Sequence, residues 1–442
     1  MKTQLNQTYI DFISKCKTER ECVNEAVFKA RCAGFLTLKE IKSKGQIKPG
    51  DKVYFVNKDK NFAAFIIGNE YGKSGINLLG AHIDSPRLDI KSNPLYEDTD
   101  IAYFDTQYYG GIKKYQWVTR PLAIHGVVCR TDGSRFNVTI GEDDNDPVFC
   151  ITDLLPHLDR KLNEKHANDF INGEQLDIII GTNKLENEEK EAVKKNIIKL
   201  LEDKYGNFTE DDFYSAELEV VPAGKARWCG LDKSMIAGYG QDDRVCAYTS
   251  LMAVINMNEI PTRTCGVVLI DKEEVGSICA TGSESRWLED VIYSISGTND
   301  RLNFASILYD TNMLSSDVTA AYDPQFADVS NKDMSAKLGG GFMLSKYNGG
   351  RGKCGGADAN PEYIAYIRNI LNNANVKYQF DTMGKVDIGG GGTIASIVCR
   401  MNINVLDAGV PVLNMHSPME IVHCDDVYNT YLGYCAFIGN KK

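Results

Sequence analysis

The sequence predicts an α/β protein in which a mixed-sheet domain is interrupted by an inserted, β-rich domain. Short apolar segments that indicate strands alternate with helical patterns near both ends of the chain. Between about residues 93 and 228 the pattern changes to β-type stretches and a charge-rich helical segment. We therefore expect residues 1–92 and 229–442 to form one domain and residues 93–228 to form the insertion.

The N-terminal part is expected to begin with helices and to continue with strands. Apolar residues within residues 6–44 have helical spacing, and Gly34 marks a helix end. Residues 52–56 and 62–68 have the composition of paired strands, and residues 78–82 form a further apolar run that indicates a buried strand. A mixed sheet is therefore expected to begin in this part of the chain.

The insertion has a different composition. Residues 122–130 and 135–140 have a β-type pattern, whereas residues 185–205 are polar, rich in charge and helical in pattern. Turn signals near Pro94 and at residues 222–224 mark where this part of the chain begins and ends. The sequence contains no internal repeat.

After Trp228, helices and strands alternate again. Strands are expected at residues 265–270 and 305–309, where short apolar runs are followed by acidic residues. The expected helices cover residues 244–256, residues 360–373, a segment that opens near residues 392–395, and residues 425–437.

The composition excludes several classes of protein. A hydrophobic content of 43% over 442 residues supports a substantial core and excludes a disordered chain. The formal charge of -11 argues against nucleic-acid or anionic-membrane partners. The 13 cysteines follow no CxxC or other regular spacing, as is typical of a reducing compartment. Because no signal-peptide pattern or apolar run of about 20 residues occurs, we expect a soluble, cytoplasmic protein.

The first candidate functional segment is His82-Ile83-Asp84, which follows the predicted buried strand Ile76–Gly80 after one residue. Open α/β sheets place their chemistry at the carboxyl ends of strands. A histidine that binds a metal usually donates its other ring N–H to a carboxylate, and Asp84 could orient His82 in this way where the local backbone turns toward His82. Taken alone, such a tripeptide is more often a polar surface pair, so other segments must decide.

Four further segments place acids or a histidine next to strand or turn signals. Each has an ordinary structural alternative. Asp242-Asp243 could be a helix N-cap, and Glu273-Glu274 could lie in a charged turn. Asp317 could be a loop acid, and His416 could be satisfied within the core or at the surface.

Together these segments supply the nitrogen and oxygen ligands of a divalent metal site. Two histidines and several carboxylates suit Zn²⁺, with Mn²⁺ or Co²⁺ as alternatives. A bridging carboxylate can hold two such ions about 3.5–4 Å apart, where they acidify a shared water and polarise a carbonyl. The donor set therefore predicts metal-dependent amide hydrolysis.

The chain also resembles a known family. The segments GAHIDSPRL, GYGQDDR, DKEEVGS, SSDVTAAYDPQF, GGGGTIA and GVPVLNMHSPME occur in the order found in the M18 metalloaminopeptidases, the aspartyl aminopeptidase group. Related M42 peptidases share some of these motifs, but the segment 315–326 and the long middle region favour M18. The resemblance implies a zinc-peptidase catalytic domain, two divalent metal ions and peptide substrates, with preference for N-terminal Asp or Glu.

The resemblance also implies a role for each matched residue. His82 and Asp317 would bind one metal ion, Glu274 and His416 would bind the other, and Asp242 would bridge the two. Glu273 would act as the general base, and Asp84 would orient His82. Two alternatives remain open: Asp243 as the bridging acid, and an exchange of roles between Glu273 and Glu274.

The middle segment resembles the family's inserted dimerisation domain. By this resemblance, His157 would reach the active site of a neighbouring subunit, although an interface histidine without catalytic contact is an equal alternative. The family further implies a homododecamer built from dimers with enclosed active sites.

One departure from the family pattern bears on the preference for acidic N-terminal residues. Many relatives carry a histidine shortly after the acid matched by Asp317, whereas this chain has Thr319-Ala320-Ala321. Lys346 or Arg351, in the glycine-rich segment 339–356, could neutralise an acidic substrate, but a flexible surface loop is the favoured interpretation. The glycine run 389–392 could approach a substrate backbone. The competing functions are a broader M42-like peptidase or deacylase, and an inactive oligomeric scaffold.

Overall fold

The computed structural model describes residues 1–441 and contains two compact units. The first unit comprises residues 1–85, 225–415 and 419–442, and the second comprises residues 86–224 with 416–418. The chain is a mixed α/β protein with several sheets, as the sequence predicts. The assignment of the middle unit as a dimerisation domain stays a prediction.

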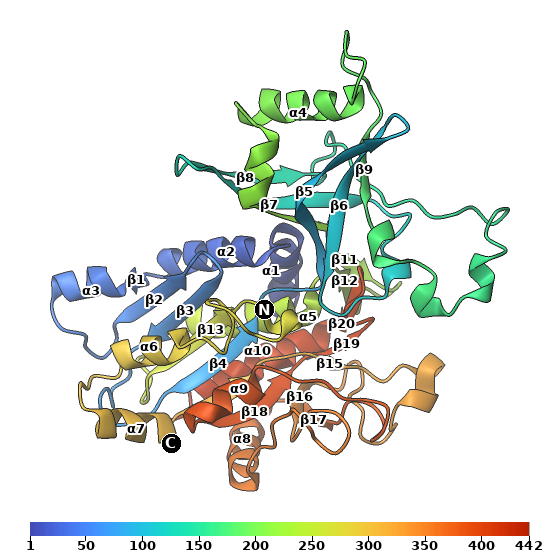
Figure 1. The fold of residues 1–442 in the computed structure, drawn as a ribbon. Helices are drawn as coiled ribbons and strands as arrows, with labels where there is room; N and C mark the ends of the chain where they lie inside the picture. Colours follow the sequence, from blue (N-terminus) through green and yellow to red (C-terminus); the bar gives the residue numbers. More distant parts are fainter. Residues whose placement is uncertain (442) are drawn as a thin grey trace. The chain divides into compact units, whose positions relative to one another are not determined.

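The first unit is built on a nine-stranded mixed sheet (Figure 1). Its four central strands are parallel, and hairpin or antiparallel pairings extend the sheet on both sides. In spatial order the strands are β1 (Leu36–Thr37), β2 (Lys52–Asn57), β3 (Asn61–Ile66), β13 (Cys265–Ile270), β4 (Asn77–His82), β14 (Asn312–Ser315), β18 (Asn404–Gly409), β16 (Phe342–Ser345) and β17 (Tyr378–Asp381).

Helices cover both faces of this sheet, because each central strand buries side chains in both directions. Leu79 and Ala81 of β4 join one apolar cluster, whereas Leu78 joins the other. The first cluster includes α1 (Lys2–Lys15), α2 (Glu19–Cys32), α5 (Gln241–Ile255), α8 (Pro361–Asn373) and α10 (Cys424–Ile438). The second includes α3 (Leu38–Lys44), α6 (Trp287–Ser294), α7 (Arg301–Tyr309) and α9 (Ala395–Val398).

A smaller five-stranded sheet belongs to the same unit. It contains the strand that follows Asp317 and the strand that precedes His416, so two of the candidate segments adjoin this sheet. Its order is β11 (Arg227–Cys229), β12 (Met235–Gly238), β20 (Glu420–His423), β19 (Pro411–Leu413) and β15 (Thr319–Ala320).

The second unit contains a six-stranded antiparallel sheet and the helix α4 (Ala192–Tyr205). The predicted strands at 122–130 and 135–140 are confirmed, and the helix begins seven residues later than the charge-rich segment 185–205 indicated. The strand order is β8 (Arg135–Ile140), β7 (Leu122–Cys129), β10 (Ala216–Pro222), β5 (Arg87–Asp98), β6 (Ile101–Tyr109) and β9 (Ile178–Gly181).

One predicted strand is wrong. Residues 305–309 lie in the helix α7, which begins after Asp300, whose side chain accepts a hydrogen bond from the N–H of Asn303. The buried residues Phe304, Ile307 and Leu308 follow helical spacing. A short apolar run alone does not distinguish a buried strand from one turn of a buried helix, and here the N-cap decides. The strand that leads to Asp317 is β14.

The other late elements follow the prediction closely. α8 and α10 begin and end within a residue of the predicted helices. α5 begins at Gln241 rather than Arg244, but Asp242 and Asp243 have non-helical backbone angles within it. Among residues 1–441, the helices are all too short or too polar to cross a membrane.

Candidate metal centre

The candidate site lies where the parallel central strands end. β13, β4 and β14 are adjacent and parallel, so their carboxyl ends meet at one edge of the sheet. His82 is the last residue of β4, Glu273 and Glu274 follow β13, and Asp317 follows β14. Topology therefore brings together three segments that are far apart in the sequence.

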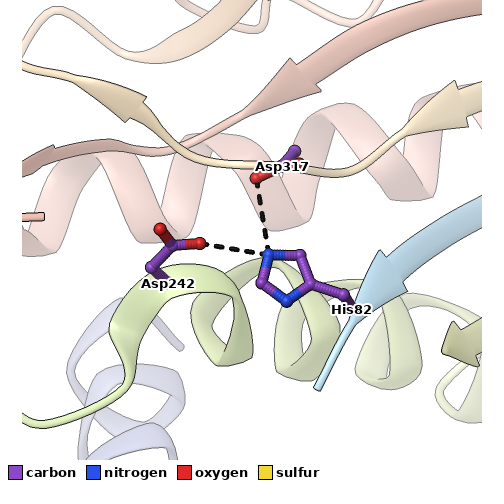
Figure 2. Close-up of side chains that lie close together, drawn as sticks. All are labelled: His82, Asp242 and Asp317. Atoms are coloured by element: carbon purple, nitrogen blue, oxygen red, sulfur yellow. Dashed lines mark hydrogen bonds and ion pairs between the residues drawn. The ribbon is translucent and has the colours of Figure 1, made fainter. Parts of the chain in front are cut away.

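His82, Asp242 and Asp317 converge at this edge (Figure 2). The Nε2 atom of His82 lies 3.1 Å from Oδ1 of Asp242 and 3.9 Å from Oδ1 of Asp317. All three residues are buried. One ligand atom from each lies within 4.8 Å of the others, which is close enough for a single ion to contact all three.

The ring of His82 is oriented by Asp84, chiefly through the main chain. The Nδ1 atom of His82 lies 3.0 Å from the carbonyl oxygen of Asp84 and 3.4 Å from its carboxylate Oδ1. With the proton on Nδ1, the ring donates to that carbonyl, and Nε2 presents a lone pair to the two acids. This is the tautomer that a metal-binding histidine requires.

The electrostatics of the cluster favour a bound cation. Burial lowers the pKa of His82, but hydrogen bonds with Asp242 and Asp84 and the charge of Asp317 outweigh burial and raise this pKa well above 6.5. Burial also raises the pKa of Asp317 well above its usual value, and the charge of Asp243 raises it further. Crowded buried carboxylates repel one another, and a divalent ion would compensate that repulsion.

A second group forms around the turn η6 (Glu273–Val275), directly after β13. His82, Glu273 and Glu274 can each place one ligand atom within 4.8 Å of the others. The buried carboxylate of Asp84 fixes this turn: Oδ1 accepts the main-chain N–H of Glu273 at 3.1 Å, and Oδ2 accepts that of Glu274 at 3.2 Å. Asp84 thus contacts both candidate ligand segments.

Side chains from other segments hold the main chain of the ligands. Asp243 Oδ2 accepts the main-chain N–H of His82 at 3.3 Å, which gives this acid a supporting position beside the cluster. Glu420 Oε2 accepts the N–H of Asp242 at 3.1 Å, and the hydroxyl of Ser85 donates to the carbonyl of Asp242 at 2.6 Å. Glu420 and Ser85 lie within the quoted motifs, but sequence reasoning assigned neither a role.

His416 and His157 fall within the second unit. The Nδ1 atom of His416 lies 2.9 Å from the carbonyl oxygen of Gly111, and the residue has a positive φ of 63°. His157 is exposed in a segment without regular secondary structure. The predicted metal role of His416 and the predicted role of His157 in a neighbouring subunit remain predictions.

The glycine-rich segment 339–356 is not wholly a surface loop. Its residues 342–345 form β16, which is buried between β18 and β17, so the loop interpretation is wrong for this part. Lys346 follows the strand directly and is exposed, as is Arg351. The main-chain N–H of Gly349 donates to the carbonyl of Gly391 at 2.8 Å, so the two glycine-rich segments support each other.

Comparisons with known proteins show which proteins this chain resembles. The sequence model of the family described as "Aminopeptidase I zinc metalloprotease (M18)" matches residues 12–438. A probable M18 family aminopeptidase 1 of Clostridium acetobutylicum is 53% identical over 441 residues, which cover 99% of this chain and 94% of that protein. The crystal structure of an M18 aminopeptidase from Thermotoga maritima superposes with a TM-score of 0.95 at 43% identity, covering 100% of this chain and 97% of that one.

Proposed function

Because the chain belongs to the M18 family of zinc metalloproteases and is therefore a peptide hydrolase of the aminopeptidase type, we propose that it uses two divalent metal ions to remove N-terminal residues from peptides. The observation that supports this most is the convergence of the His82 imidazole with the buried carboxylates of Asp242 and Asp317. This nitrogen and oxygen donor set suits Zn²⁺, with Mn²⁺ or Co²⁺ as alternatives.

Each residue has a separate role in this proposal. His82 and Asp317 hold one ion, Glu274 and His416 hold the other, and Asp242 bridges them. When bound, the ions would polarise the scissile carbonyl and lower the pKa of the attacking water. The list of proposed ligands is therefore His82, Asp242, Glu274, Asp317 and His416.

Glu273 is the proposed general base, which takes a proton from the attacking water and returns it to the leaving amine. Its turn η6 is held by the two main-chain hydrogen bonds to Asp84. The same aspartate orients the imidazole of His82, chiefly through its carbonyl. Asp84 is thus a positioning residue for both the base and a ligand.

The preferred substrates in this proposal are peptides with an N-terminal Asp or Glu, and the exposed cations Lys346 and Arg351 are candidates for neutralising that side chain. A broader M42-like peptidase and a deacylase are the enzymatic alternatives. Cleavage of peptides with free but not blocked N-termini distinguishes an aminopeptidase from a deacylase.

We further propose that the middle unit mediates dimerisation in a cytoplasmic homododecamer, in which His157 reaches a neighbouring active site. Leu154, Leu155 and Leu158, around His157, are 42%, 50% and 66% exposed in the single chain, as expected of a surface that another subunit covers. A His157→Ala variant that keeps its oligomeric state but loses turnover would support the role in a neighbouring site, and full turnover would exclude it.

The direct test is incubation of the metal-loaded protein with a mixed pool of peptides, followed by mass spectrometry. We expect loss of single N-terminal residues, fastest for Asp and Glu. A Glu273→Gln variant should keep its metal content and lose turnover, because the amide cannot accept the proton. Wild-type protein that holds two ions but cleaves nothing would refute the aminopeptidase, and assembly without metal binding would favour the scaffold.

A further inference from the structure

The segment from Asp271 to Thr281 carries Glu273 and Glu274 and is largely exposed at its outer end. Val275 and Ile278 are 45% and 74% exposed. The single turn η6 has a residue with positive φ on each side, Lys272 at 72° and Gly276 at 89°. Two internal hydrogen bonds shape the turn: the N–H of Gly276 donates to the carbonyl of Glu273 at 3.0 Å, and the N–H of Ser277 donates to that of Lys272 at 2.7 Å. The position of so short a turn relative to the sheet depends on outside contacts.

The beginning of this segment is held by Asp84, as described above, and its far end is held by a different set of contacts. The hydroxyl of Thr281 donates to the carboxylate Oδ2 of Asp271 at 2.7 Å. Thr281 is 5% exposed and Asp271 is fully buried. This one hydrogen bond joins the two ends of the segment that carries the proposed base.

Asp271 also belongs to a buried charge cluster outside the metal centre. The ammonium group of Lys60 lies 3.1 Å from Glu19 Oε1 and 4.0 Å from Asp271 Oδ2. Glu19 is fully buried and Lys60 is 7% exposed. Buried ionisable groups are costly unless they are paired, so Lys60 partners both acids.

The hairpin of β2 and β3 fixes the same end of the segment through its amides. The side-chain N–H of Asn57 donates to the carbonyl of Ala280 at 2.9 Å, and that of Asn61 donates to the carbonyl of Thr281 at 2.7 Å. The hairpin therefore holds residues 280 and 281, and the hydrogen bond from the Thr281 hydroxyl fixes Asp271 relative to them.

We propose that Thr281 is a positioning residue for the reaction, because its bond to Asp271 closes the segment so that Glu273 and Glu274 keep a fixed place at the metal centre. This inference rests on the proposed function of those two glutamates. Without the bond, the segment would be held at Asp84 and at the hairpin but would no longer be joined across its ends. A displacement of about 1 Å at a catalytic group can cost about 100-fold in rate.

The test compares Thr281→Val, which removes the hydroxyl and keeps the shape, with Thr281→Ser, which keeps the hydroxyl. Both variants are prepared as full chains with Co²⁺, and their visible absorption spectra and peptide kinetics are measured. We expect Thr281→Val to change the Co²⁺ spectrum, because Glu274 shifts, and to lower kcat about tenfold with KM unchanged. Thr281→Ser should resemble the wild type in both measurements.

A role in stability alone would lower the melting temperature of Thr281→Val without changing the Co²⁺ spectrum, and that result would overturn the proposal. If this variant does not fold, Thr281→Ala provides the second test, because it removes the same hydroxyl donor without placing a methyl group against the carboxylate of Asp271. An unchanged spectrum in Thr281→Ala would then overturn the proposal. Failure of the proposed function is distinct, since the wild-type protein would then be inactive or would bind no Co²⁺.

Discussion

Replacing Gly409 with alanine should displace Asp317, because the last residue of β18 lies directly against the main chain of that acid. A Cβ atom at position 409 would lie 2.0 Å from the carbonyl oxygen of Asp317 and 2.8 Å from Sγ of the buried Cys246. Ordinary van der Waals contacts begin at 3.4 Å, so the 317 segment would have to move. Overpacking of this kind costs about 1–3 kcal/mol in stability.

The matched control is Gly350→Ala, since a Cβ atom at position 350 would meet nothing within 4 Å. Urea denaturation of the metal-free proteins should show a loss of about 1–3 kcal/mol for Gly409→Ala and a change within about 0.5 kcal/mol for the control. Because Asp317 moves, kcat/KM should also fall about 100-fold. Wild-type stability and activity in Gly409→Ala would refute the packing described here.

Two further changes address buried carboxylates. Asp84→Asn should lower the stability of the metal-free protein by about 1–3 kcal/mol, because an amide can accept only one of the two N–H groups of Glu273 and Glu274. The exposed Asp387→Asn is the control, and equal denaturation midpoints would contradict the expectation. Burial raises the pKa of Asp426 from 3.8 to about 7, so the folded protein holds a proton that the unfolded chain releases between these values. The resulting stability is present below about pH 4 and is lost as the pH rises through 7. In denaturation curves, the stability of the wild type relative to Asp426→Asn should therefore fall over this pH range. A constant difference would be inconsistent with the raised pKa.

Part of the central sheet could be predicted, because strands such as β4 and β13 are buried on both faces, whereas β14, β16, β17 and β18 of the same sheet were not predicted. β4 and β13 are continuous apolar runs bounded by polar residues, and their positions differ from the prediction by at most one residue. The same reasoning failed at residues 305–309, where the run is as apolar but the chain is helical. A short apolar run indicates burial, and the hydrogen bonds that decide its conformation come from its flanking residues.

Sequence reasoning could predict the part of the candidate site that lies at the carboxyl ends of strands. His82 ends one parallel strand and Asp317 follows another, although that second strand, β14, is not the one predicted at residues 305–309. Their convergence results from the order of these strands in the sheet. Glu420 and Ser85 could not be assigned, because each acts on the main chain of Asp242 more than 150 positions away. Main-chain contacts of this kind leave no spacing pattern in a single sequence.

The central claim is that the chain holds two metal ions, bridged by Asp242. Its most direct test is the metal content of the purified, Zn²⁺-loaded protein, measured by inductively coupled plasma mass spectrometry beside the activity at each loading. We predict two ions per chain, with turnover that requires the second. Full turnover with one ion per chain, or an Asp242→Ala variant that still binds two ions, would contradict the claim.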